Sequence, residues 1–227
     1  MLDRLHLCVI TDARPESGRD HLEIARAALI GGADMIQLRD KTGSLRELLP
    51  QACAIRLLCR SHGALFIVND RLDLALAAEA DGAHVGQEDF PASQARRLLG
   101  RGRILGVSTH SLAQAQAARA TGADYIGFGP IFATGTKDTG YIPRGLEALR
   151  EIRAAVSLPI LAIGGISLGN VSEVIAAGAT APAVISAVVA APDVAAAATA
   201  FRERVAAAKR DLDGAAATGA RDPSHTG

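Results

Sequence analysis

The stretch DYIGFGPIFATGTKDTG, residues 124–140, joins a short strand pattern to a polar loop. Residues 124–128 are predicted as the strand, which ends where Gly129-Pro130 interrupts the pattern. The loop behind it holds Thr134, Gly135, Thr136 and Lys137. Glycine lets the backbone approach a ligand closely, hydroxyls donate hydrogen bonds to phosphate oxygens, and lysine supplies a positive charge. The stretch therefore predicts a strand whose end binds an anion, with a solvated polar turn as the alternative.

The same change from strand to helix recurs along the whole chain. Strands are expected at residues 5–10, 35–38, 65–68, 83–85, 103–107, 125–128, 159–163 and 183–186. Helices are expected at residues 20–30, 44–61, 72–80, 92–99, 111–121, 144–155, 168–177 and 192–209. Strict alternation implies a parallel sheet with crossover helices, and eight units favour a closed (β/α)8 TIM barrel over an open doubly wound sheet.

The chain is expected to form one domain followed by a tail. Residues 1–210 make up the predicted barrel. Residues 211–227 are rich in Gly, Ala, Ser, Thr and Asp without apolar periodicity, so they are expected to be disordered. A Gly-Ala pair precedes four predicted strands, at Gly32-Ala33, Gly82-Ala83, Gly122-Ala123 and Gly178-Ala179. This weak internal repeat indicates a recurring helix-to-strand turn.

Composition excludes several classes of protein. Lys plus Arg and Asp plus Glu both number 24, so the zero net charge argues against nucleic acid as a partner. Apolar residues make up 49% of the 227 residues and aromatic residues 3%, which predicts an aliphatic core. The three cysteines show no disulfide framework, and no run is long enough to cross a membrane. A cytoplasmic protein with small-molecule substrates is expected, and a homo-oligomer is compatible with these data.

Polar residues follow the second predicted strand, where a barrel carries its active site. Gln37 and Arg39 share one face at a period of two, and Ile36 and Leu38 share the other. The apolar pair should face the helices, so the polar pair should point inward, with Lys41 just beyond. Such a set suits a diphosphate, because arginine binds phosphate through a planar fork. An ion pair of Arg39 with an acid across the barrel is the alternative.

Two acids follow the third and fourth predicted strands. Asp70 comes directly after Asn69, and Asp89 lies shortly after the fourth strand. Neighbouring strands are about 4.8 Å apart, so both carboxylates can reach one ion. Magnesium is commonly held by one or two carboxylates together with water and substrate phosphates. The pair therefore predicts a magnesium site, although each acid alone could cap a helix.

The remaining strand ends predict a second anion site. Gly164-Gly165 follows the seventh strand, and Ile185-Ser186 closes the eighth. Barrels commonly bind a monophosphate there through backbone N–H groups. The fifth strand delivers Ser108 and His110, and His110 is either a general base or a helix-start residue. No nucleophile–base pair is evident, which favours a transfer reaction in which diphosphate leaves and a second phosphorylated molecule attacks.

Several segments that carry these residues share the pattern of one family. They are QLRDK (37–41), NDRLDLA (69–75), GAHVGQEDFP (82–91), GVSTHS (106–111), DYIGFGPIFATGTKDTG (124–140), ILAIGGIS (160–167) and VISAV (184–188). Together they resemble thiamine-phosphate synthase, over about residues 5–208. That resemblance implies condensation of hydroxymethylpyrimidine diphosphate with hydroxyethylthiazole phosphate. Diphosphate would leave first, and the thiazole nitrogen would capture the pyrimidine carbocation.

The resemblance also implies residue roles by motif position. The pyrimidine diphosphate would be held by Gln37, Leu38, Arg39, Asp40, Lys41, Asn69, Ser108 and Lys137. The thiazole phosphate would be held by Thr134, Gly135, Thr136, Gly165, Ile185 and Ser186. One Mg²⁺ per subunit would be bound by Asp70 and Asp89, and the predicted catalytic residues are Lys137, Ser108, Arg39 and Lys41.

Two other functions are weighed against this one. A thiazole tautomerase on the same barrel would carry a histidine near the end of the sixth strand, where this chain has Gly129-Pro130. A non-catalytic barrel that binds thiamine precursors would need neither two aspartates nor Lys137. Magnesium-dependent release of diphosphate separates the synthase from both.

Overall fold

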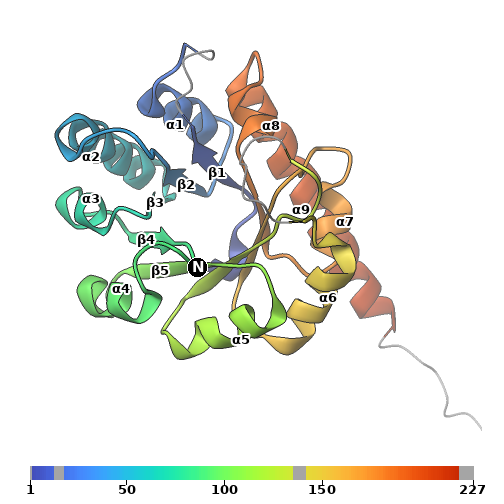
Figure 1. Cartoon of the computed structure of the whole chain (residues 1–227). Helices are drawn as coiled ribbons and strands as arrows, with labels where there is room; N and C mark the ends of the chain where they lie inside the picture. Colours follow the sequence, from blue (N-terminus) through green and yellow to red (C-terminus); the bar gives the residue numbers. More distant parts are fainter. Residues whose placement is uncertain (1, 13–17, 135–141, 220–227) are drawn as a thin grey trace, which may run out of the picture.

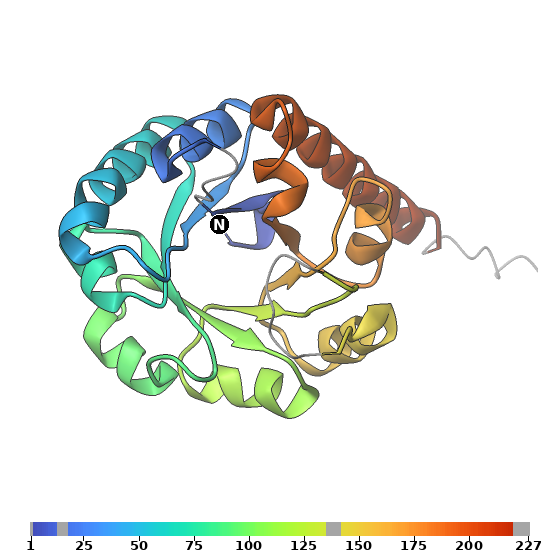
Figure 2. The same cartoon turned by 45° about the horizontal axis from the view of Figure 1, so that its top comes forward.

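The computed structural model describes residues 2–12, 18–134 and 142–219. Eight parallel strands form one closed barrel in chain order, which confirms the predicted (β/α)8 fold (Figures 1 and 2). The strands are β1 (Cys8–Thr11), β2 (Met35–Leu38), β3 (Leu65–Asn69), β4 (Gly82–Val85), β5 (Ile104–Thr109), β6 (Tyr125–Phe128), β7 (Ile160–Ile163) and β8 (Ala181–Val184). Their carboxyl ends meet at one rim.

Helices form a ring around this barrel, as Figure 2 shows. They are η1 (Leu2–Arg4), α1 (His21–Ile30), α2 (Leu45–His62), α3 (Leu72–Ala77), α4 (Ala92–Leu99), α5 (Leu112–Ala120), α6 (Gly145–Ala155), α7 (Val171–Ala176), α8 (Ser186–Val189) and α9 (Val194–Gly219). The short helix α8 was not predicted, and it begins at a residue that was assigned to the eighth strand. No helix in the described ranges is long and apolar enough to span a bilayer.

Apolar side chains form two layers, one inside the barrel and one between barrel and helices. Met35 belongs to the inner layer, whereas Ile36 and Leu38 belong to the outer one. Gln37 therefore faces the barrel interior, where it is 4% exposed. The expected inward direction of Gln37 is confirmed, and alternation along β2 is its cause.

Pro182 lies inside β8, although the sequence placed it just before that strand. Its Cα pairs with Ala162 of β7, whereas pairing with β1 begins only at Ala183. A proline cannot donate to the ladder, so it is tolerated only where a backbone donor can be lost. Ile185 follows this strand directly and precedes α8.

The internal repeat is a side-chain clamp at the opposite end of the barrel from the strand carboxyl ends. The segments after α1, α3, α5 and α7 share one pattern. A residue in the left-handed backbone conformation is followed by an alanine and then by an aspartate or threonine. These triplets are Gly32-Ala33-Asp34, Glu79-Ala80-Asp81, Gly122-Ala123-Asp124 and Gly178-Ala179-Thr180, with φ of 85°, 51°, 83° and 103° at the first position. The Gly82-Ala83 pair is therefore out of register with the other three. Glu79 takes the left-handed place that glycine takes elsewhere.

The last residue of each triplet forms two hydrogen bonds with one residue at the start of the preceding odd-numbered strand. In the second triplet the Asp81 N–H donates to the Phe66 carbonyl at 2.9 Å, and the Phe66 N–H donates to Asp81 Oδ2 at 2.7 Å. The same double contact joins Asp34 to Leu7, Asp124 to Leu105, and Thr180 to Ile160. These side chains satisfy strand-end N–H groups that would otherwise be buried without a partner.

We expect Asp81→Ala to destabilise the protein, because the Phe66 N–H then loses its acceptor. A buried unsatisfied donor costs about 1–3 kcal/mol. For a chain of this size the melting temperature should fall by roughly 3–10 °C. Asp81→Asn keeps an oxygen acceptor and should retain most of that stability, and Asp3→Ala at an exposed position is the control. Equal melting curves for Asp81→Ala and Asp3→Ala would refute the role of the clamp.

The last helix extends beyond the predicted end of the barrel domain. Helix α9 continues to Gly219, so the expectation of disorder from residue 211 is wrong for residues 211–219. Residues 220–227 lie outside the described part. Alanine is the strongest helix former, so an alanine-rich segment continues the helix without an apolar face. Residues 211–215 are exposed, whereas Phe201 of the same helix is 1% exposed.

Removal of residues 211–227 should leave the melting temperature and activity almost unchanged. Exposed residues contribute within about 0.5 kcal/mol, which is about 2 °C here. Phe201→Ala is the contrasting variant and should cost about 3–5 kcal/mol, because it empties a core position. Thermal unfolding of both proteins checks this. A loss of several degrees on truncation would show that the segment docks on the barrel.

Candidate active site

Two adjoining pockets open where the strands end. The first is lined by Ile10, Gln37, Arg39, Asn69, His84, Ser108, Gly127, Leu161, Ile163, Ala183 and Ile185. The second is lined by Ser108, His110, Gly127, Gly129, Pro130, Thr134, Ile163, Gly164, Gly165, Ile166, Ala183, Val184, Ile185, Ser186 and Ala187. Ser108, Gly127, Ile163, Ala183 and Ile185 belong to both, so the pockets share one wall. The structure thus brings together predicted ligand residues from β2, β3, β5, β7 and β8.

Arg39 presents an unsatisfied donor in the first pocket. Its Nε atom is buried, and no described group accepts a hydrogen bond from it. No carboxylate in residues 2–12, 18–134 or 142–219 forms an ion pair with Arg39, so these residues do not support the alternative of an ion pair across the barrel. A buried polar group without a partner is costly, so this donor is suited to a ligand oxygen.

Asp70, Asp89 and Lys41 form an ion cluster at the rim. The Lys41 ammonium hydrogen-bonds Asp70 Oδ2 and lies 3.5 Å from Asp89 Oδ1. The side chains of Lys41, Asp70 and Asp89 are 48%, 15% and 30% exposed. The two acids therefore converge on one point, as the adjacency of β3 and β4 predicts.

Local backbone geometry directs both acids to the rim. Asp70 adopts a left-handed conformation with φ of 60°, and its N–H donates to the His84 carbonyl at 2.8 Å. The Gly86 N–H donates to Asp89 Oδ2 at 3.0 Å, and a Cβ at Gly86 would lie 2.4 Å from that oxygen. The helix-cap alternative is wrong for both, since Arg71 and Pro91 hold those cap positions.

The cluster shifts the pKa of each of its members. Burial raises the pKa of Asp70, and the neighbouring Asp89 acts in the same direction. Burial also acts to raise the pKa of Asp89, but the influence of Asp70 and the charge of Lys41 outweigh it and lower that pKa. For Lys41, burial lowers the pKa, but both carboxylates outweigh it and raise the value. Two carboxylates and an ammonium thus share one strongly polarised site.

This donor set fits magnesium. Within the described ranges no three His, Cys, Asp or Glu residues gather as a metal-binding group. A closed all-protein site of the kind that zinc or calcium uses is therefore not formed by these residues. Magnesium keeps several water ligands and accepts one or two carboxylates together with substrate phosphates. Asp70 and Asp89 can provide those two carboxylates.

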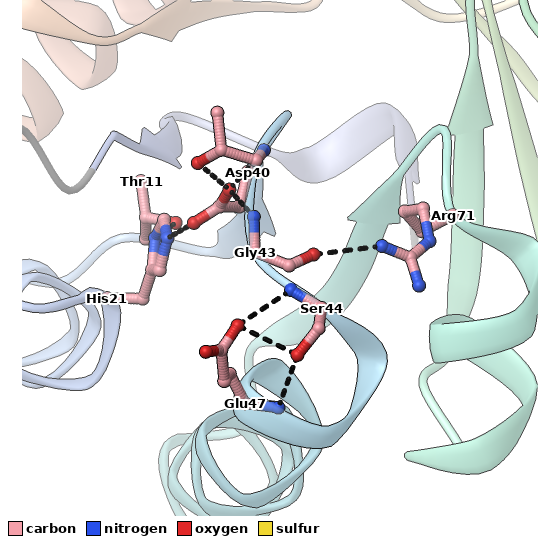
Figure 3. A network of polar contacts seen from close by, with 8 residues as sticks. Thr11, His21, Asp40, Gly43, Ser44, Glu47 and Arg71 are labelled. Carbon is pink, nitrogen blue, oxygen red and sulfur yellow. Dashed lines mark hydrogen bonds and ion pairs between the residues drawn. The ribbon is translucent and has the colours of Figure 1, made fainter.

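The loop that carries Lys41 is held by Asp40 (Figure 3). Asp40 Oδ1 accepts from the N–H groups of Thr42 and Gly43, each at 2.7 Å. Asp40 Oδ2 contacts His21 Nε2 at 3.1 Å, and the Nδ1 atom of this buried histidine contacts Thr11 Oγ1 at 2.7 Å. Both carboxylate oxygens of Asp40 are thus engaged by the protein. These contacts fix the loop. Direct binding of diphosphate by the Asp40 side chain stays a prediction.

The far side of the same loop is fixed by a helix cap (Figure 3). Ser44 and Glu47 form a capping box at the start of α2. Arg71 Nη1 donates to the Gly43 carbonyl at 3.2 Å, which ties the loop to the segment behind Asp70. The β2 loop and the β3 end are therefore joined by direct contacts.

Glycines shape the second pocket. Gly164 and Gly165 have positive φ of 98° and 64°, and a Cβ at Gly165 would lie 2.5 Å from the Ala133 carbonyl oxygen. This close approach lets the chain after β6 run beside the end of β7, where the Phe132 N–H donates to the Gly164 carbonyl at 3.0 Å. Thr134 is thereby brought to the same pocket as Gly165.

His110, Ile185 and Ser186 also line the second pocket. His110 Nδ1 contacts the Gly129 carbonyl at 2.6 Å, so its ring is anchored at the end of β6. Ile185 and Ser186 enter the pocket between β8 and α8. Predicted ligand residues Gly135, Thr136 and Lys137 lie outside the described residues.

The structure reveals buried polar residues that the sequence interpretation missed, among them His21, His84 and Tyr125. His84 Nε2 lies 2.9 Å from Ser108 Oγ, so a serine–histidine pair is present where the sequence suggested none. The detectable signal was a polar side chain at an inward position of a short apolar strand, since His84 occupies such a place in β4.

The hold of Asp40 on its loop should weaken at acid pH. Burial acts to raise the pKa of Asp40, but the N–H groups of Gly43 and Thr42 and the contact with His21 lower it well below its usual range. A depressed carboxyl pKa stabilises the fold above the unfolded value of about 3.9, and this stabilisation is lost as pH falls below it. Asp40→Asn should therefore lower the melting temperature more at pH 7 than at pH 3. Asp3→Asn controls for lost surface charge, and an equal gap at both pH values would contradict the assignment.

Comparison with known proteins shows the family. The family model described as thiamine monophosphate synthase matches residues 7–188. The thiamine-phosphate synthase of Methanoculleus marisnigri is 56% identical over 205 residues, which cover 90% of this chain and 97% of that protein. The Moorella thermoacetica thiamine-phosphate synthase is 56% identical over 203 residues, covering 89% and 97%.

A solved structure agrees with these relatives. The thiamine phosphate pyrophosphorylase from Pyrococcus furiosus superposes with a TM-score of 0.83 at 40% identity, covering 91% of this chain and 98% of that one. The chain belongs to the thiamine monophosphate synthase family.

Proposed function

We propose that this chain joins hydroxymethylpyrimidine diphosphate to hydroxyethylthiazole phosphate, forming thiamine phosphate and releasing diphosphate. The observation that carries this proposal is the pair of adjoining pockets that share the lining residues Ser108, Gly127, Ile163, Ala183 and Ile185. Substrates bound in two adjoining pockets lie next to each other, so their reacting atoms can meet. Such positioning alone provides a large part of a bimolecular rate enhancement.

The first pocket suits the pyrimidine diphosphate. Gln37, Asn69 and Ser108 offer hydrogen-bonding groups for the ring. Arg39 has a buried donor without a described partner, and Lys41 stands at the rim. These cations would bind the diphosphate oxygens, and Lys137 would join them by motif position.

Asp70 and Asp89 would hold one Mg²⁺ beside the diphosphate. Bound Mg²⁺ would neutralise negative charge on the leaving group. The Lys41 ammonium, which contacts both acids, is then placed to donate to the diphosphate as it departs. Charge stabilisation at the leaving group requires no covalent nucleophile.

The second pocket suits the thiazole phosphate. Thr134 and Ser186 bring hydroxyl groups, and Gly165 brings a backbone without a side chain close to them. Gly135 and Thr136 would complete the phosphate site by motif position. The thiazole nitrogen would then point toward the first pocket and capture the pyrimidine cation after diphosphate has left.

A cytoplasmic location is part of the proposal. Cys8, Cys53 and Cys59 are free thiols, and Cys53 is exposed, which suits a reducing compartment. The tautomerase alternative has less support, because the end of β6 carries Gly129 and Pro130 where that enzyme would carry a histidine. The synthase alone releases diphosphate.

The deciding experiment mixes the purified protein with both phosphorylated precursors and Mg²⁺. Thiamine phosphate and an equal amount of diphosphate should form, and chelation of the metal should stop the reaction. Formation of neither product, with a folded protein, would refute the proposed function.

Asp89→Ala would remove a ligand of Mg²⁺ and Lys137→Ala would remove a positive charge. Each should lower turnover about 100-fold or more, because the leaving diphosphate then loses charge stabilisation. Both variants should unfold near the wild-type temperature. Glu147→Ala, which removes an exposed acid on α6, is the control and should keep full activity. Near-normal rates in both variants would show that the site assignment is wrong.

A further inference from the structure

A buried chain of polar side chains adjoins the first pocket, which His84 also lines. The Tyr125 hydroxyl is 3.0 Å from His84 Nδ1, and His84 Nε2 is 2.9 Å from Ser108 Oγ. Tyr125 is 1% exposed and His84 is 7% exposed. Neither residue belongs to the predicted ligand set, yet the chain ends on Ser108, which lines both pockets.

Strand register builds this chain of contacts. His84 of β4 pairs with Gly106 of β5, and Gly106 pairs with Tyr125 of β6. A Cβ at Gly106 would lie 2.4 Å from both His84 Nδ1 and the Tyr125 oxygen. Gly106 therefore allows the side chains of His84 and Tyr125, from β4 and β6, to meet across β5. Ser108 lies two residues further along β5, on the same face.

The other end of the chain reaches Gln37. The Gln37 side chain interacts with the Tyr125 phenol and acts to lower its pKa. Burial raises the pKa of that phenol well above its usual value, and the effect of Gln37 opposes this only in part. Tyr125 therefore stays protonated and always has one hydrogen to donate. Both ends of the chain, Gln37 and Ser108, line the first pocket.

A serine–histidine pair usually suggests a nucleophile and its base. In the serine hydrolases a buried carboxylate stabilises the imidazolium that forms. Here a neutral phenol occupies that position, and it cannot balance a positive charge on His84. The arrangement is therefore suited to holding a fixed hydrogen-bond direction.

We propose that His84 and Tyr125 are positioning residues that make the Ser108 hydroxyl a donor to the pyrimidine ring. In this arrangement Tyr125 donates to His84 Nδ1, and His84 Nε2–H donates to Ser108 Oγ. The Ser108 hydrogen is then directed into the pocket. This inference rests on the proposed function, because it assigns the ring to the first pocket.

The opposite direction would place an acceptor against the ring. If Ser108 donated to His84 Nε2, only its lone pairs would face the ligand. Pyrimidine ring nitrogens are acceptors, so two acceptors would then oppose each other. The direction set by Tyr125 therefore discriminates in favour of a ring with unprotonated nitrogens.

The test uses the full chain with Mg²⁺ and both substrates. Tyr125→Phe keeps the ring but removes the donor to His84, which can then accept from Ser108. The KM for the pyrimidine diphosphate should rise about tenfold, as expected for one hydrogen bond, while the KM for the thiazole phosphate stays within about twofold. Adding Tyr125→Phe to Ser108→Ala should cause little further change, because both act through one hydroxyl.

A second pair of variants tests His84 directly. His84→Gln keeps an N–H that can donate to Ser108, whereas His84→Leu does not. The KM for the pyrimidine diphosphate should therefore be lower in His84→Gln than in His84→Leu. Phe66→Leu is the packing control, since it removes buried apolar volume away from His84 and Tyr125 and should lower only the melting temperature.

Three results would overturn the inference. One is an equal rise of both KM values in Tyr125→Phe, and another is no rise in either. The third is a fall in kcat of about 1,000-fold in the His84 variants, with the KM for the pyrimidine diphosphate unchanged. That result would mark His84 as a general base. Wild-type protein that forms no thiamine phosphate would instead refute the proposed function, so the two failures are distinguishable.

Discussion

Closure of eight parallel strands is the constraint on which this structure depends. Every strand runs in the same direction, so every carboxyl end reaches the same rim. Asp70 and Asp89 follow different strands, yet they meet at one ammonium. Residues far apart in the sequence become neighbours because parallel pairing brings the carboxyl ends of adjacent strands together. The two pockets with a shared wall are a direct result of that closure.

The inner face of the barrel sets the chemistry available at the rim. Alternation along β2 places Gln37 inward between apolar residues that face the helices. Gly106 then lets His84 and Tyr125 touch across β5, which an L side chain at that point would prevent. Small residues are therefore as important as the polar ones, because they create the space in which directed hydrogen bonds form.

Much of the fold could be predicted from the sequence, because alternating apolar periods report directly on strands and helices. The bounds of β2, β6 and α4 agree with the expected ones. The convergence of Asp70 and Asp89 was also predictable, since it needs only strand order. The boundary at residue 210 was not, because composition without apolar periodicity suggested disorder where alanine continues α9.

The buried chain of polar side chains and the clamps needed three-dimensional information. Contact between His84 and Tyr125 depends on register across three strands, which single-strand periodicity does not contain. The second clamp was misread because Glu79 adopts a conformation that the sequence pattern reserved for glycine. The roles of Gly135, Thr136 and Lys137 remain assigned by motif position alone.

The clamps divide the cylinder into four similar modules, each an odd strand, an even strand and their helices. The last residue of each triplet ties the two strands of its own module together. A module fastened in this way can form from residues close in sequence before the ring is complete. Sequence change at the opposite rim then leaves that fastening untouched, so new ligand specificity can arise without loss of foldability.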